Sequence, residues 1–131
     1  MAQKQFIDVP GLYDSRQRGY EQCIVVGDLV FVAGQGGLDE QAQLVSPDFE
    51  PQARQALHNT RRALEAAGAS PADVTSVTLY FTDIANLRAY SAIKAEVLPE
   101  MRATSTAVEV SKLALPGMIF EVTVTAVRSD A

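Results

Sequence analysis

Glu121 is the one carboxylate in the stretch SKLALPGMIFEVTVTAVR, residues 111–128. Side chains alternate between the two faces of a β-strand, so Glu121 shares a face with Thr123, while Phe120 and Val122 point the other way. A carboxylate that is partly withdrawn from water has a raised pKa, which suits it to act as a general base. Such a carboxylate can also have a structural role, in which it caps backbone groups or pairs with a cation across an interface. The sequence leaves the catalytic and the structural role open.

Few other side chains in the sequence suit catalysis. We expect His58 to lie in solvent on a helix, and Cys23 to be a small buried hydrophobe at the start of a strand. Glu109 lies on a neighbouring predicted strand, where a carboxyl pair with Glu121 would raise one of the two pKa values. The segment GQGG, residues 34–37, lacks the lysine and the spacing of a phosphate loop and predicts a turn or bulge. One Cys and one His are too few for a structural zinc site, so we expect neither a metal nor a cofactor.

Hydrophobic periodicity predicts the element order β-β-β-α-β-α-β-β. The predicted strands cover residues 6–10, 22–26, 29–34, 74–83, 105–110 and 118–127, and the predicted helices cover residues 48–67 and 83–99. This order indicates an α/β fold, a mixed sheet with both helices packed on one face.

Local signals support both helices. Pro51 suits the first turn of the first helix, and Gly68 suits the position just after its end, while Asn59 falls outside the apolar stripe. Asp83 is a suitable cap for the second helix, whose predicted apolar stripe begins at Ile84.

The helix-free face of the sheet is expected to be semi-polar. We expect the odd-numbered side chains of the last two strands, Ser105 and Glu121 among them, to share this face. A chain of 131 residues with such a face would expose a large, partly apolar surface, so closed symmetric association is predicted.

Composition limits the class of protein. A chain of 131 residues fits one domain, and 47% hydrophobic with 21% charged residues is ordinary globular composition. We therefore expect one domain over residues 1–131. The net charge of −5 argues against nucleic acid as a partner, because phosphate binding needs clustered Lys and Arg. The sequence has no apolar run long enough to cross a membrane and no signal-peptide pattern, so we predict a cytoplasmic protein without a membrane partner.

Several segments resemble the RidA (YjgF) family, in the same order and at nearly the same spacing over roughly residues 15–128. They are GYEQ followed by VAGQ, then QARQALHNTRRALEAAGAS, VTLYFTD, and STAVEVSKL with the later FEV. The resemblance implies a chorismate-mutase-like fold and a homotrimer with three clefts between subunits. Many members of the family hydrolyse reactive enamines and imines to 2-oxo acids and ammonia.

The resemblance also implies site residues. The family's cleft tyrosine falls on Tyr20, its backbone turn on Ala33, Gly34 and Gln35, and its water-orienting glutamate on Glu121. The arginine that holds the substrate carboxylate in the family is replaced by Ser105, the proline before it by Ala103, and a second glutamate of the last strand by Thr123.

Two basic residues are candidate replacements for the missing arginine. Arg102 lies three residues before Ser105, and Lys112 follows the strand. An α-carboxylate is held best by a guanidinium that is already aimed at it, so standard 2-imino acid deaminase activity is in doubt.

Two classes of function remain open. The first is a hydrolase or deaminase that uses Glu121 to orient water against a small imine, enamine or amide. The second is a trimer that binds a metabolite or a partner protein without turnover. RNA cleavage is associated with some relatives, but the net negative charge of this chain gives it no support.

Overall fold

The computed structural model describes residues 3–129, and the predicted domain bounds, 1–131, extend beyond them at both ends. Its β-strands are β1 (Lys4–Phe6), β2 (Cys23–Val26), β3 (Leu29–Gln35), β4 (Val74–Phe81), β5 (Thr104–Glu109) and β6 (Phe120–Val127). Its α-helices are α1 (Phe49–Ala66) and α2 (Leu87–Val97), and the short 3-10 turns are η1 (Arg16–Arg18), η2 (Pro71–Asp73) and η3 (Ile84–Asn86). The predicted order β-β-β-α-β-α-β-β is confirmed.

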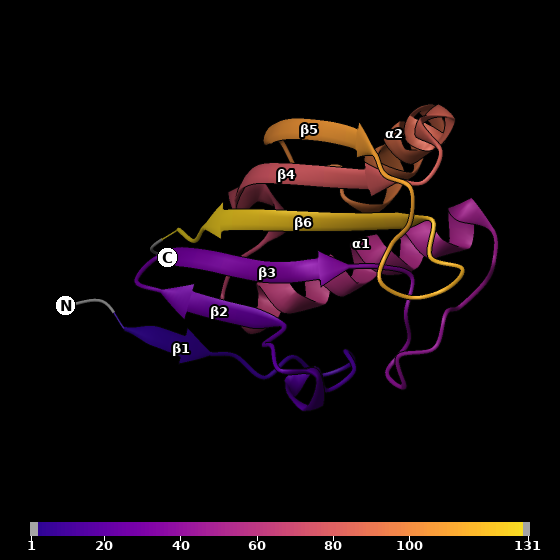
Figure 1. Cartoon of the computed structure of the whole chain (residues 1–131). Coiled ribbons are helices and arrows are strands. Elements are labelled where there is room, and N and C mark those ends of the chain that lie inside the picture. Colours follow the sequence, from indigo (N-terminus) through magenta and orange to yellow (C-terminus); the bar gives the residue numbers. More distant parts are fainter. Residues whose placement is uncertain (1–2, 130–131) are drawn as a thin grey trace.

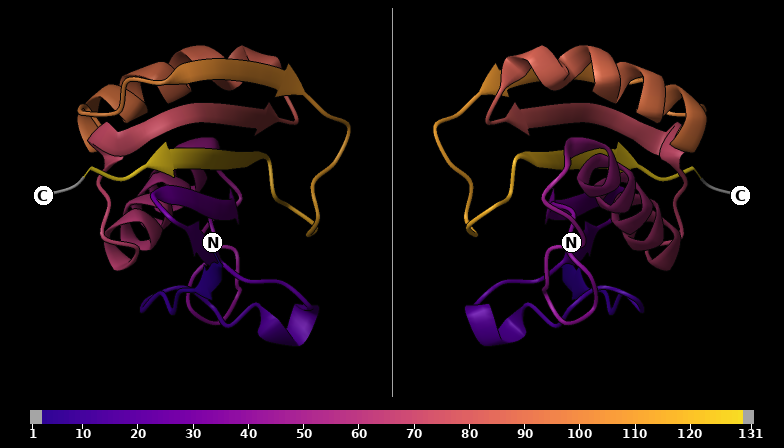
Figure 2. Two further views of the ribbon diagram at one scale, coloured as in Figure 1. Left: turned by 90° about the vertical axis from the view of Figure 1, so that its left-hand side faces the viewer. Right: turned by 90° about the vertical axis from the view of Figure 1, so that its right-hand side faces the viewer.

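The strands form one mixed sheet in the order β1-β2-β3-β6-β4-β5. Neighbouring strands are antiparallel except β4 and β5, which are parallel and are joined through α2. Both helices cover the same face of the sheet (Figure 1), as predicted. The long segment between β5 and β6 projects from one end of the sheet (Figure 2).

The core lies between the sheet and the helices. The even-numbered residues of β6, from Phe120 to Ala126, are at most 2% exposed, and they pair in register with buried residues of β3 and β4. Glu121 pairs with Tyr80 on the opposite, helix-free face. The predicted faces of the last strand are therefore confirmed.

Helix α1 ends where the sequence predicts. Gly68 has a φ of +76°, and the N–H of Ala69 donates to the carbonyl of Leu64, so the chain leaves the helix through a left-handed residue. Asn59, however, is only 3% exposed, and Gln52 is fully buried. The assignment of Asn59 to the outer side of the helix was wrong, because its amide binds backbone carbonyls of a packed loop.

Two local predictions need correction. The first strand, predicted over 6–10, is β1 at Lys4–Phe6, since that is the segment paired with β2. Asp83 caps η3 rather than α2, with its carboxylate accepting from the N–H of Ala85. Ile84 is 40% exposed and therefore lies outside the core stripe to which it was assigned.

The register of β5 also differs from the prediction. Ser105 pairs with Val77 and Glu109 pairs with Phe81, and both partners belong to the buried face. Paired residues point to the same side of a sheet, so the odd-numbered residues of β5 lie on the helix side, away from Glu121. The expectation that Ser105 and Glu121 share one face was wrong for a single chain.

Candidate functional site

The carboxylate of Glu121 lies against the backbone of β3. A Cβ atom added at Gly34 would come within 2.7 Å of the Glu121 Cδ, so the glycine leaves the space that the side chain occupies. Among the described residues, Glu121 has no hydrogen-bond or ion-pair partner, and its side chain faces a pocket of about 380 Å³. Glu121 is thus placed to accept a proton from a bound water or ligand.

The pocket combines polar and apolar walls. Tyr13, Arg18, Tyr20 and Gln35 line it together with Glu121. Leu38, Ala114, Leu115 and Met118 supply the apolar side. A pocket of this size with a few converging polar groups suits a small metabolite.

The titratable groups of the pocket have distinct roles. Burial raises the pKa of Glu121, because the charged carboxylate loses solvation. The pKa of Tyr20 is raised strongly by burial and by a hydrogen bond with the Tyr13 hydroxyl, while Arg18 lowers it and Glu121 raises it by smaller amounts. Tyr20 therefore remains a neutral phenol, and Glu121 is the better general base of the two.

A chain of amides connects the pocket to the N-terminal loop. The ladder between β3 and β6 is irregular between Val32 and Gln35. The Gln35 amide donates to the Gln22 side chain at 2.9 Å, and the Gln22 amide donates to the carbonyl of Tyr13 at 3.2 Å. The irregular ladder agrees with the predicted turn or bulge near GQGG. The two amide bonds link this irregularity to the backbone of Tyr13.

Helix α1 fixes the other walls through two buried amides. Gln52 donates to the carbonyls of Ser46 and Gly117 and accepts from the N–H of Ile119, all at 2.9 to 3.0 Å. Asn59 donates to the carbonyls of Gly36 and Leu38. The glycine turn and the segment carrying Met118 are thereby held to one helix.

The structure brings together only some of the predicted site residues. Tyr20, Gly34, Gln35 and Glu121 line the pocket. Ala33 is not among the lining residues, and its N–H donates to the carbonyl of Gln22.

The predicted cation replacements lie elsewhere. Val108 and Glu121 both pair with Tyr80, and Arg102 precedes Val108 by six residues, on the order of 20 Å along an extended chain. Lys112 lines a separate pocket of about 520 Å³ formed by the segment 111–119 and Thr82. Roles for Arg102 and Ser105 in substrate binding therefore require a cleft shared with a second subunit, and they stay predictions.

Glu109 does not approach Glu121. Its carboxylate accepts from the N–H of Ile84 at 3.0 Å on the helix side of the sheet. The hypothesis of a carboxyl pair was therefore wrong, and Glu109 has the backbone-capping role that was the alternative for Glu121.

Sequence reasoning missed several residues of the pocket, and Arg18 is the cation among them. Its guanidinium carbon lies 5.0 Å from the centroid of the Tyr13 ring. The segment RQRGYEQ places it two residues before Tyr20, which was the available signal. The turn η1, which carries the side chain, lies between the first two predicted strands, where the sequence pattern predicts no helix or strand.

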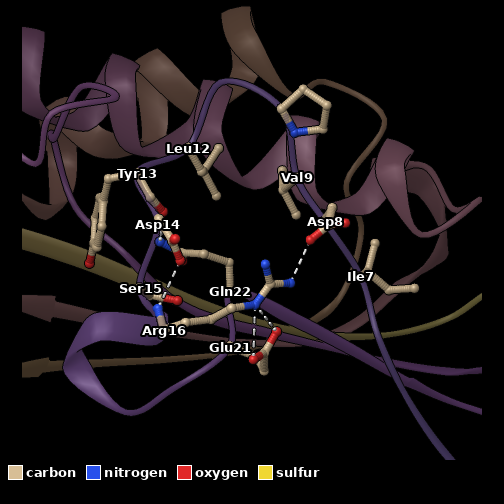
Figure 3. Close-up of a pocket in the computed structure, with 11 residues that line it drawn as sticks. Ile7, Asp8, Val9, Leu12, Tyr13, Asp14, Ser15, Arg16, Glu21 and Gln22 are labelled. Atoms are coloured by element: carbon tan, nitrogen blue, oxygen red, sulfur yellow. Dashed lines mark hydrogen bonds and ion pairs between the residues drawn. The ribbon is translucent and has the colours of Figure 1, made fainter.

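A second pocket lies beside the first, on the other side of Tyr13. It has a volume of about 280 Å³, and Figure 3 shows Arg16 at its centre, between Asp8 and Glu21. The Arg16 Nε is 3.2 Å from a carboxylate oxygen of Glu21, and a terminal nitrogen is 2.5 Å from Asp8. Because its cation is already paired, this pocket is the weaker candidate site.

Residues 3–129 contain no group of three or more His, Cys, Asp or Glu side chains placed to hold a metal ion. Within the same range, neither helix has the length and apolarity that a membrane crossing requires.

Comparisons with known proteins place the chain among small α/β proteins. A family model described as endoribonuclease L-PSP matches residues 15–128. A RutC family protein of Pyrococcus horikoshii is 39% identical over 95 residues, which cover 72% of this chain and 75% of that protein. The 2-iminobutanoate/2-iminopropanoate deaminase of Salmonella typhimurium is 32% identical over 97 residues, which cover 72% of this chain and 76% of the enzyme.

Solved structures show the same architecture. Rv2704 of Mycobacterium tuberculosis, a member of the YjgF/YER057c/UK114 family, is 30% identical with a TM-score of 0.80, over 95% of this chain and 99% of its own. RidA from an Antarctic Psychrobacter is 27% identical with a TM-score of 0.85, over 94% of this chain and 98% of its own.

Proposed function

The chain belongs to the endoribonuclease L-PSP family, the RidA (YjgF) group, and from that premise we propose that the Glu121 pocket hydrolyses a small imine or enamine. The observation that carries the proposal is the carboxylate of Glu121, which has no partner among residues 3–129 and faces a pocket of metabolite size. The Salmonella relative named 2-iminobutanoate/2-iminopropanoate deaminase supports this class of reaction.

In the proposed reaction, Glu121 takes a proton from water as the water oxygen bonds to the imine carbon, and it returns this proton to the nitrogen to give a carbinolamine. Glu121 then carries the proton of the carbinolamine hydroxyl to the nitrogen as the carbon–nitrogen bond breaks, and ammonia and a carbonyl compound leave. The raised pKa of Glu121 suits this exchange, because a carboxyl group accepts and returns a proton most readily when its pKa approaches the working pH.

We further propose that the working site is a cleft of a homotrimer. Five of the large apolar residues that the chain exposes lie on the helix-free face of the sheet: Phe6, Leu29, Phe31, Val108 and Val127. An apolar surface of this kind is usually covered by another subunit. A neighbouring subunit would also enclose the pocket from the side that is open in the single chain.

A second candidate function is metabolite binding without turnover. Ser105 stands at the position of the family's carboxylate-binding arginine, and this substitution favours a ligand that is held but not converted. The two functions differ in whether product forms.

A turnover assay separates the two functions. 2-Iminopropanoate is generated in situ and its disappearance is followed with and without the protein. We expect the wild-type protein to accelerate hydrolysis, and Glu121→Gln to lower kcat by about 10²- to 10⁴-fold, since the amide cannot accept the proton. A wild-type rate equal to that of buffer would remove the deaminase proposal and leave the binding module.

A further inference from the structure

The arginines of the N-terminal half differ in whether they have an acidic partner. Arg16 and Arg54 lie in ion pairs with two carboxylates each, and Arg61 pairs with Glu100. Over residues 3–129 the structure pairs Arg18 with no acidic side chain, although it lines the same pocket as Glu121. One wall of the pocket thus carries an unpaired cation and another carries an unpaired carboxylate.

The turn around η1 fixes the position of Arg18. The hydroxyl of Ser15, a residue only 2% exposed, donates to the carbonyl of Tyr20 at 2.6 Å, and the N–H of Arg18 donates to the carbonyl of Ser15 at 2.8 Å. Gly19 has a φ of +85° and closes the turn with an N–H bond to Arg16. The backbone that carries Arg18 is therefore tied at both ends.

The Tyr13 ring also orients the guanidinium. The Arg18 guanidinium carbon lies over the Tyr13 ring, 5.0 Å from its centroid, and within residues 3–129 the N–H groups at the edge of the guanidinium have no hydrogen-bond acceptor. An edge of this kind binds a carboxylate through two parallel hydrogen bonds. The carbonyl of Tyr13 accepts from the Gln22 amide, and its hydroxyl contacts the Tyr20 hydroxyl. The position of the Tyr13 ring beside Arg18 is therefore fixed at both ends of the residue.

We propose that Arg18 binds the carboxylate of a 2-imino acid in its dipolar form, and so takes over the role that the resemblance gives to the arginine replaced by Ser105. The inference rests on the proposed function for the reaction itself. Such a molecule carries a protonated imine nitrogen and a carboxylate, and the pocket offers Glu121 to the first and Arg18 to the second. The balanced reaction is R–C(=NH₂⁺)–COO⁻ plus H₂O giving R–CO–COO⁻ plus NH₄⁺.

This assignment resolves the difficulty that Ser105 raised. The guanidinium comes from the turn before β2 and not from β5, so the family position can be a serine while the pocket still holds a carboxylate. Neither Arg102 nor Lys112 is then needed as a replacement, and neither lines this pocket.

The test measures binding, so that it does not depend on turnover. Pyruvate, the 2-oxo acid product, and its uncharged analogue pyruvamide are titrated separately into the full-length protein, and both dissociation constants are measured by NMR. We expect the wild type to prefer pyruvate, and Arg18→Gln to lower the affinity for pyruvate by about tenfold while leaving that for pyruvamide unchanged. Arg18→Lys keeps the charge but lacks the planar guanidinium, so its affinity for pyruvate should lie between those of the wild type and Arg18→Gln.

Arg88→Gln is the matched control, because Arg88 is an exposed arginine on α2 outside both pockets. It removes the same charge and should leave both dissociation constants unchanged. The inference is overturned if the wild type shows no preference for pyruvate, or if Arg18→Gln keeps that preference. Hydrolysis by the wild type together with an unchanged preference in Arg18→Gln would overturn the inference alone. Absence of hydrolysis with a preference that depends on Arg18 would overturn the deaminase proposal alone.

Discussion

At the scale of single residues, Glu121 lies on the face of the sheet that its position in the strand predicts. An acid at an odd position of a strand with a buried even face must lie on the other face, and the structure places it there, beside Gly34. The cost of keeping this charge out of water should appear in the stability of the protein as well as in its activity.

The pH dependence of stability tests this cost. Burial raises the pKa of Glu121 above its ordinary value of 4.5, so between the unfolded and folded pKa values the native state binds more protons than the unfolded state. The penalty for the charged form therefore appears as the pH rises through this window, and it is absent below the ordinary value. We expect Glu121→Gln to melt at a higher temperature than the wild type at pH 7 and at nearly the same temperature at pH 3.5. A difference in Tm that is constant between these two pH values would contradict the raised pKa.

The sequence predicts some members of the site and misses others. Tyr20, Gly34, Gln35 and Glu121 follow from the family pattern and line the pocket. Arg18 could not be found in this way, because its place in the pocket depends on the turn η1 and on contact with the Tyr13 ring. A charged residue in an irregular loop has no periodic pattern from which its direction can be predicted.

At the scale of elements, hydrophobic alternation predicts which side chains of a strand are buried only where one face of the strand is apolar and the other polar. The last strand alternates clearly and its faces were predicted correctly. The segment TSTAVE of β5 has no apolar face, and five of its six residues are exposed. Its register is set by parallel pairing with β4 after a helical crossover, which is tertiary information.

The buried amides of α1 show a related limit. Periodicity assigns glutamine and asparagine to solvent, yet Gln52 is fully buried and satisfies backbone groups of two loops that are distant in sequence. Such a residue is recognised only when the loops it binds are known.

Gln52→Ala should therefore be costly. The change leaves the N–H of Ile119 and the carbonyls of Ser46 and Gly117 without their partner, and we expect a loss of about 2–4 kcal/mol in the free energy of unfolding. Urea denaturation monitored by circular dichroism gives this value. Gln41→Ala, at an exposed glutamine of the preceding loop, should stay within about 0.5 kcal/mol of the wild type. Equal effects of the two substitutions would contradict the role assigned to Gln52.

At the scale of the whole molecule, the sheet separates two unlike surfaces. Helices α1 and α2 cover one face (Figure 1). The other face carries exposed apolar residues beside threonines and Glu121. Phe31 lies within this open face, paired with Ile24 on one side and Thr125 on the other, and it is 44% exposed. A lone chain would leave this surface in water, and closed association would cover it.

Phe31→Glu should prevent this association. A carboxylate on each subunit would be brought into an apolar contact together with its symmetry mates, and the cost of desolvating these charges would exceed the gain from burying the remaining surface. We expect the wild type to have three times the chain mass of 14.1 kDa by light scattering and the variant to have the mass of one chain. If turnover requires the proposed cleft between subunits, the rate of hydrolysis should fall together with the mass. Val45→Glu, at a 41% exposed valine outside the sheet, should remain trimeric. A trimeric Phe31→Glu variant would exclude this face as the interface, and a monomeric wild type at micromolar concentration would overturn the trimer itself.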